Sequence, residues 1–239
     1  GSLAGSGTLG LLIPPSIILI IYGVAVQESI AKLFIAGIIP GIMIALIFMS
    51  YVIIWSLINK KFMPKIIEEY SFLEKIKRSK QLLPVIILIL AVIGSIYTGI
   101  ATATEAASLG VVGALILSYF QKSLTLKTFK SSLLGATKTS CMIAFILAGS
   151  TFLSLAMGFT GLPRNLALWI QNMELSPYVL IFVLMIFYII LGMFLDGISA
   201  VVLTMAIIEP MIRQAGFDMI WFGIFLVIVV EMAQITPPV

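Results

Sequence analysis

The sequence predicts an all-α integral membrane protein, built as a multi-span helical bundle in which some helices are broken. Hydrophobic residues make up 61% of the 239 residues and charged residues only 10%, whereas about 25% of a soluble domain is charged. Long apolar runs recur along the chain, and ~20 apolar residues let a helix cross the hydrocarbon. Proline pairs interrupt or end two of these runs, and prolines end or kink helices.

The first apolar segment, residues 8–26, is interrupted by Pro14 and Pro15. Two adjacent prolines remove two N–H donors and clash with the preceding turn, so a continuous helix cannot pass through them. We therefore expect a broken helix here, with Ser16 beside the break.

A spanning helix is predicted over residues 42–58. Residues 27–37 have the pattern of a short amphipathic helix, and Pro40-Gly41 predicts a break between the two. We assign residues 1–58 to the end of a first repeat, in which the broken helix precedes the spanning helix.

Residues 59–82 form a basic linker with apolar residues at helical spacing, which predicts an amphipathic helix on the membrane surface. Seven of the fourteen basic residues lie between Lys60 and Lys80, and a second cluster follows the next apolar block (Lys122, Lys127, Lys130 and Lys138). Short loops rich in Lys and Arg stay in the cytoplasm. Both clusters are therefore predicted to be cytoplasmic.

Residues 83–239 are assigned to a second repeat. The predicted elements are, in order, an out-and-back pair over 84–120 cut at 101–105, a long helix over 130–158, a short amphipathic stretch over 164–173, a helical hairpin over about 177–213, and an apolar run over 218–234 broken at 235–238. The two double prolines match: Ile13-Pro14-Pro15-Ser16 and Ile235-Thr236-Pro237-Pro238 each carry one hydroxyl residue. Repeat-built transporters bind ions and substrate where paired helices are broken, so a secondary transporter is favoured over an enzyme.

Several other classes are excluded by residue types. The chain has no His and a single Cys, Cys141, so a disulfide framework is excluded and zinc or haem ligation is disfavoured. Cys141 is predicted to be a small packing residue. No phosphate loop, nucleophile–His pair or redox-cofactor motif is present, so we expect no cofactor besides coupling ions. Basic residues alternate with membrane-length apolar runs, which argues against nucleic-acid binding.

The double-proline breaks are the first candidate sites. Carbonyls and hydroxyls freed at an unwound segment are hard oxygen ligands, which suit a small monovalent cation together with the negative ends of half-helices. This predicts ligands beside Ser16 and Thr236. The alternative is a kinked helix without a ligand.

Asp196 is the second candidate, because it is the one Asp within the apolar hairpin. An acid at the bilayer centre costs ~2.5–3.5 kcal/mol on insertion scales, so Asp196 is expected to face protein or water. Gly197 and Ser199 allow a tight, hydrogen-bonded turn. We predict a re-entrant hairpin tip near the substrate, and an ordinary turn at the membrane surface is the alternative.

A third polar break contains Thr102, Thr104 and Glu105. Glu105 fits best as an acid at a helix N-terminus, where it is favourable against the helix dipole. Glu209 and Glu231 stand alone in apolar context, and each is a candidate lining residue.

Taken together, the motifs resemble the large membrane subunit of TRAP (tripartite ATP-independent periplasmic) transporters. The resemblance rests on Gly7 to Ser16, Tyr22-Gly23, Gly37 to Gly41, Gly99 to Ala107, and Gly216 to Val239. It covers nearly the whole chain in the same order. It implies the later part of that subunit, without the region that carries the family's first re-entrant hairpin.

What the resemblance implies is an elevator-type, sodium-coupled importer of organic acids with inverted repeats, multi-pass in the bacterial inner membrane. Its partners would be a periplasmic binding protein and a small membrane subunit, separate or fused. One sodium site would involve Ile13, Pro14 and Ser16, and a second Gly197, Ser199, Thr236 and Pro237. The substrate would lie between the hairpin tips, near Ser16, Asp196, Thr236 and Thr104.

Two other functions are kept as alternatives. A divalent-anion/sodium symporter would share the two hairpins but need no binding protein. A membrane anchor of an oxidoreductase would need haem or quinone ligands, and the chain has no His for haem. The substrate stays open among sialic acid, C4-dicarboxylates and other acids, since half-helix N-termini favour anions.

Overall fold

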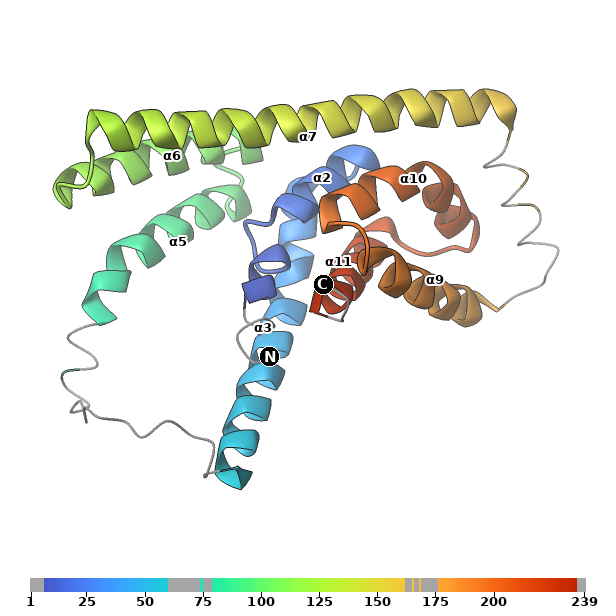
Figure 1. Ribbon diagram of the computed structural model, residues 1–239, viewed down its shortest axis with the longest axis horizontal. Helices are drawn as coiled ribbons and strands as arrows, with labels where there is room; N and C mark the ends of the chain where they lie inside the picture. Colours follow the sequence, from blue (N-terminus) through green and yellow to red (C-terminus); the bar gives the residue numbers. More distant parts are fainter. Residues whose placement is uncertain are drawn as a thin grey trace. The chain divides into compact units, whose positions relative to one another are not determined.

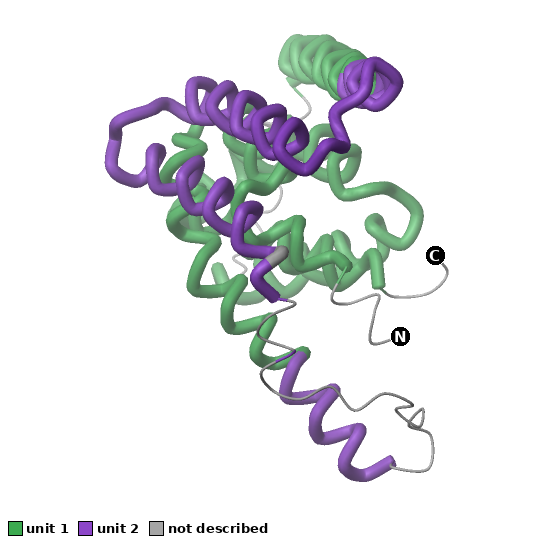
Figure 2. The backbone as a smooth tube through the Cα atoms, turned by 90° about the vertical axis from the view of Figure 1, so that its left-hand side faces the viewer, with its two compact units in different colours: residues 1–48, 137–239 green, residues 49–136 purple. Residues whose placement is uncertain are grey.

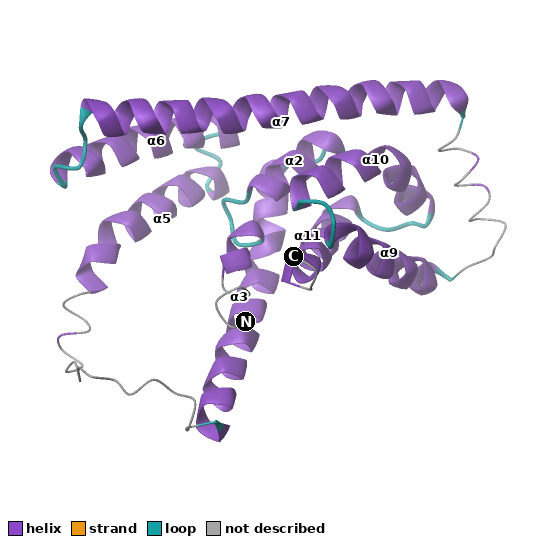
Figure 3. Ribbon diagram, viewed as in Figure 1, coloured by secondary structure: helices purple, strands orange, loops and turns teal. Residues whose placement is uncertain are grey.

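The computed structural model describes residues 7–59, 74, 79–161, 165, 168 and 176–235. Within this part every regular element is a helix and no strand occurs, as Figure 3 shows. The elements are η1 (Leu9–Leu11), α2 (Ile17–Ala25), α3 (Ile30–Ile58), η3 (Lys80–Leu82), α5 (Leu83–Tyr97), α6 (Ala103–Phe120), α7 (Leu126–Thr160), α9 (Pro177–Gly192), α10 (Gly197–Gln214) and α11 (Met219–Ile235). The predicted all-α class is confirmed.

Membrane-length helices recur along the described chain. α3, α6, α7 and α10 are each long and apolar enough to cross a bilayer. α5, α9 and α11 are apolar but shorter. Because ~20 apolar residues span the hydrocarbon, this set of helices fits a multi-pass membrane protein.

The chain divides into two compact units, coloured in Figure 2. The first contains residues 1–48 and 137–239, and the second contains residues 49–136. The divisions fall inside α3 and α7.

α11 is at the core of the first unit. It packs against α9, α10, α2 and η1, and α2, α9, α10 and α11 lie together in Figure 1. Most of its side chains are buried, including Phe222, Leu226 and Val230. A helix that is apolar on all sides belongs in an interior, which explains the apolar run from Met219 to Val230.

The predicted break at Pro40-Gly41 is wrong, because α3 is continuous from Ile30 to Ile58 with Pro40 inside it. The predicted short helix over 27–37 is accordingly part of α3. Proline costs a membrane helix one backbone hydrogen bond, which its surroundings can replace. Gly41 instead serves a close contact: a Cβ added there would lie 2.9 Å from Cγ1 of Ile13.

The helix pair predicted over 84–120 is confirmed in the second unit. α5 and α6 pack against each other and are joined by residues 98–102, where Gly99 has a φ of 72°. α7 extends beyond the predicted 130–158 at both ends, and α10 ends at Gln214, next to the predicted end of the hairpin at about 213. The predictions for 164–173 and for the 59–82 linker fall almost entirely outside the described residues.

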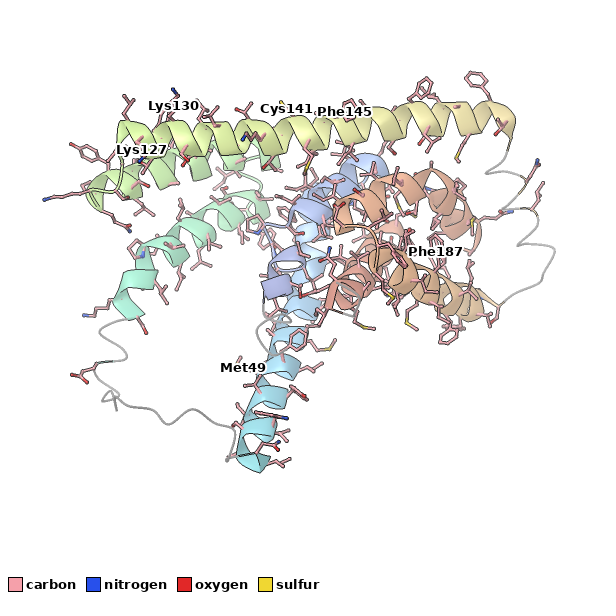
Figure 4. All side chains as sticks on the ribbon, viewed as in Figure 1. Met49, Lys127, Lys130, Cys141, Phe145 and Phe187 are labelled. Carbon is pink, nitrogen blue, oxygen red and sulfur yellow. The ribbon has the colours of Figure 1, made fainter. Side chains whose placement is uncertain are left out.

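Cys141 is not the buried packing residue that was predicted. Its side chain is exposed on α7, and Figure 4 labels it there beside Phe145. The most apolar stretch of α7 has no buried residue. In a bilayer, lipid tails are as apolar as leucine, so an apolar sequence does not imply burial within the protein.

Candidate functional site

Interrupted helices meet at Gly197 in the first unit. A Cβ built on Gly197 would lie 2.6 Å from Cδ1 of Ile18, 2.9 Å from Cγ1 of Val230 and 3.1 Å from Nε2 of Gln234. Ile18 lies in the first turn of α2, Gly197 begins α10, and Gln234 lies in the last turn of α11. The starts of two helices and the end of a third therefore come together around a position too crowded for a side chain.

Ser16 holds the first break together. Its side chain is fully buried, and its hydroxyl accepts a hydrogen bond from the Leu19 N–H at 3.2 Å. The same hydroxyl donates to the carbonyl of Leu11. Ser16 thus caps α2, as serine commonly caps helices, and joins it to the last residue of η1.

The other predicted ligands of this break lie between η1 and α2. Ile13 donates its N–H to the Leu9 carbonyl at 2.9 Å and leaves its side chain 40% exposed. Pro14 is buried, and the bond between Pro14 and Pro15 is cis. The predicted interruption at these prolines is confirmed, and sodium binding by Ile13 and Pro14 stays a prediction.

Asp196 caps the second interrupted helix. One oxygen of its carboxylate, Oδ2, accepts from the backbone N–H groups of Ile198 at 3.1 Å and Ser199 at 3.2 Å. The side chain of Asp196 is exposed within this chain, while Gly197 is buried. The predicted hydrogen-bonded turn is confirmed, and its place in the membrane and its ligands stay predictions.

Thr236 and Pro237 lie outside the described residues, directly after the end of α11 at Ile235. The last described turn of α11 places Gln234 against Gly197. The end of α11 therefore lies against the start of α10. Gln234 itself was not predicted, although an amide near the end of an apolar helix and just before a Thr-Pro-Pro break was a usable signal.

The helix ends give this region mixed electrostatics. Helix N-termini carry about half a positive charge and C-termini about half a negative charge. The N-termini of α2 and α10 favour an anionic group, and the C-terminus of α11 favours a cation. One region could therefore receive both a carboxylate and a monovalent cation, as transporters with discontinuous helices do.

Thr104 belongs to the second unit, where it is exposed in the first turn of α6. Its neighbours form a capping box: Thr102 Oγ1 accepts from the Glu105 N–H at 3.3 Å, and a Glu105 carboxylate oxygen accepts from the Thr102 N–H at 2.8 Å. The predicted role of Glu105 at a helix N-terminus is confirmed. Substrate binding by Thr104 stays a prediction.

Glu209 lines a cavity together with residues of α2, α7 and α10, and its carboxylate is also paired. Its Oε1 accepts from Nε of Arg213 at 2.9 Å, and Nη2 of Arg213 also donates to the Val26 carbonyl at 3.2 Å. Arg213 therefore links the end of α10 to Val26, the residue that follows α2. In the sequence Glu209 stands alone in its apolar segment, and its pairing with Arg213 was not predicted.

Apolar helices that are interrupted and meet inside one unit are typical of multi-pass membrane transport proteins. Residues 1–239 match the family described as Tripartite ATP-independent periplasmic transporter, DctM component. The chain belongs to this family.

Relatives in several bacteria support the assignment. The chain is 32% identical over 241 residues to the C4-dicarboxylate TRAP transporter large permease protein DctM of Pseudomonas aeruginosa, covering 100% of this chain and 56% of the relative. It is 31% identical to the sialic acid TRAP transporter large permease protein SiaM of Vibrio cholerae, covering 100% and 55%. It is 29% identical to the isethionate TRAP transporter permease protein DctMQ of Oleidesulfovibrio alaskensis, covering 99% and 37%. The chain thus spans only about half, or less, of the length of these relatives.

Proposed function

We propose that this chain is part of the membrane transport subunit of a sodium-coupled importer of organic acids, located in the bacterial inner membrane. The observation that carries the proposal is the meeting of Ile18, Gly197 and Gln234 at the ends of interrupted helices. Carbonyls and hydroxyls at such ends can bind sodium, while the helix N-termini attract an acid group.

The substrate class is a small organic anion. The relatives are named for C4-dicarboxylates, isethionate, 2,3-diketo-L-gulonate and sialic acid, and each of these carries an anionic group. In the proposed arrangement the anion lies near Ser16, Asp196 and Thr236, which all belong to the first unit.

Two partners complete the proposed transporter. A periplasmic binding protein delivers the acid, and a small membrane subunit, separate or fused, accompanies the large one. The part of the protein that holds the hairpin over about 177–213 carries ions and substrate across the membrane in an elevator movement. Ile13, Pro14 and Ser16 serve one sodium site, and Gly197, Ser199, Thr236 and Pro237 serve the other.

The test uses the complete transporter in proteoliposomes with its binding protein. The acid is first identified by screening an acid panel for thermal stabilisation of the purified binding protein. We expect uptake to require both an inward sodium gradient and the binding protein. Uptake without the binding protein would favour the divalent-anion/sodium symporter instead, and uptake that ignores sodium would contradict ion coupling.

Thr236→Ala tests the second ion site. Thr236 precedes two prolines in the sequence, and prolines leave backbone carbonyls without their helical N–H partners. Loss of the hydroxyl should therefore raise the sodium concentration needed for half-maximal uptake while expression stays normal. An unchanged sodium activation curve in a well-expressed variant would remove Thr236 from the site.

A further inference from the structure

Glu231 is a buried carboxyl that the candidate site does not use. Its side chain, in α11, is only 3% exposed. Neither carboxyl oxygen has a hydrogen-bond partner among the described residues. The hydroxyl of Thr8 approaches the carboxyl without reaching hydrogen-bond geometry.

No charged group in the described part of the chain compensates Glu231. The elements packed most closely against α11 are η1, α2, α9 and α10, and α3 approaches it at Gly37. η1 has no titratable side chain. Most titratable groups of these elements, and the acid that precedes α11, are engaged elsewhere: Arg213 with Glu209 and Glu28, Asp196 with backbone N–H groups, Tyr22 with the Met219 carbonyl, Tyr188 with Thr204, and Asp218 with the Trp221 N–H. The others, Tyr178 of α9 and Lys32 in the part of α3 that belongs to this unit, are exposed.

An ionised Glu231 would be unstable in this position. A buried charge without a partner costs several kcal/mol, and a carboxyl avoids that cost by holding a proton. A metal cation would need several oxygen ligands, whereas Thr8 provides one nearby hydroxyl. The proton is therefore the ligand that these surroundings favour.

The cover over Glu231 belongs to the broken helix. Glu231 and Ile224 are seven residues apart in α11 and so share one face. A Cβ on Gly37 would lie 3.6 Å from Cδ1 of Ile224 and 3.1 Å from the Leu12 carbonyl oxygen. With Thr8 near Glu231 and Leu12 near Ile224, residues 8–12 cover this face of α11 and lead directly into the Pro14-Pro15 break.

We propose that Glu231 is a proton-binding site of the transporter, loaded when residues 8–12 cover α11 and emptied when they separate from it. In the release step the carboxyl O–H bond breaks and the proton passes to water, which leaves a hydrated carboxylate. The inference rests on the proposed transport function and adds a proton-linked step to it.

The first measurement needs no transport. Infrared spectra of the purified complete transporter are compared between the wild type and Glu231→Gln, without substrate. We expect the carbonyl stretch of a protonated carboxyl to be lost in the variant and kept in Glu28→Gln, whose acid lies 3.9 Å from Arg213. Equal bands in wild type and Glu231→Gln would overturn the proposal.

The second measurement follows protons during uptake. Proteoliposomes with saturating sodium and an enclosed pH-sensitive dye should show a pH-dependent uptake rate and a luminal pH change with the wild type and with Glu28→Gln. Glu231→Gln should lose both the pH dependence and the pH change. A wild-type pH profile and dye signal in Glu231→Gln would overturn the proposal.

Two further experiments distinguish failure of the proton-binding proposal from failure of the proposed transport function. If Glu231→Gln does not fold, Glu231→Met takes its place. Independently of the variants, the infrared band of the wild type is measured at several pH values during sodium-driven uptake. A band that persists at every pH would mean a permanently neutral carboxyl and would overturn the proposal. If no sodium-driven uptake occurs at all, the proposed function fails, while loss of the infrared band in the variant still supports proton binding by Glu231.

Discussion

The phenol oxygen of Tyr22 donates a 2.6 Å hydrogen bond to the carbonyl oxygen of Met219, 197 positions further along the chain. The Tyr22 side chain is fully buried. Its ring lies directly over Gly223 in the next turn of α11: a Cβ there would lie 2.8 Å from Cδ1 and 3.0 Å from Cζ. This contact fixes the end of α2 against the start of α11. It thereby helps to position the start of α2 and the end of α11, which meet at Gly197.

Gly223→Ala should destabilise the protein by about 1–3 kcal/mol, because the added methyl overlaps a buried ring. Thermal unfolding of the purified transporter checks this. Gly149→Ala in α7 is the matched control, since a Cβ there meets nothing within 4 Å, and its melting temperature should stay the same or rise. A second substitution, Tyr22→Leu, should recover part of the loss in Gly223→Ala, and no recovery would show that the ring is not the cause.

Gly197→Ala should impair transport more than folding. The new methyl would push α2 and α11 away from the start of α10, since it comes within 2.6 Å of Ile18 and 2.9 Å of Val230. We expect a higher sodium requirement for uptake and a lower maximal rate. Gly94→Ala, where a Cβ meets nothing within 4 Å, is the control. Wild-type sodium activation in Gly197→Ala would separate this contact from ion binding.

Ser16→Ala should cost about 1–3 kcal/mol, because it removes a helix cap and leaves the Leu11 carbonyl without its donor. Sodium activation of uptake should weaken at the same time. Ser29→Ala removes a weaker, exposed cap bond of 3.4 Å to the Lys32 N–H, and we expect a loss below about 1 kcal/mol. Equal melting temperatures for the two variants would contradict the bridging role of Ser16.

Asp196→Asn separates charge from capping. Asn caps helices about as well as Asp, so expression and melting temperature should change little, while uptake should fall if the carboxylate orders ions or substrate. Asp218→Asn is the matched control, because Oδ1 of Asp218 accepts from the Trp221 N–H at 2.8 Å in the same kind of turn, and its uptake should stay normal.

Thiol labelling tests whether the turn at Asp196 is a re-entrant tip or an ordinary turn at the membrane surface. In a Cys141→Ala background, needed because Cys141 is exposed, Asp196→Cys should be protected from a membrane-impermeant reagent by sodium or substrate. Fast labelling that ignores both, together with normal transport by Asp196→Asn, would identify an ordinary surface turn and exclude the re-entrant tip.

Local chemistry was readable from the sequence wherever a single segment decides it. The proline pair ahead of Ser16 predicted a break in the helix. Gly197 and Ser199 beside Asp196 predicted a hydrogen-bonded turn. Pro40 shows the limit: a lone proline in a long apolar helix looks like a break, yet the helix passes through it. The meeting of Gly197 with Gln234 could not be predicted, because it depends on how whole helices pack.

The crowding at Gly197 has a consequence for protein engineering. Three helices touch at Gly197, so nearly every larger residue there would overlap its neighbours. Ser16 is equally hard to replace, because it is buried and its hydroxyl both donates and accepts a hydrogen bond. Libraries meant to redirect the transporter to a new acid should therefore leave these two positions fixed. They should vary an exposed residue of the adjoining turn that has no capping role, such as Phe194, where a new side chain can enter the path of a ligand without forcing helices apart.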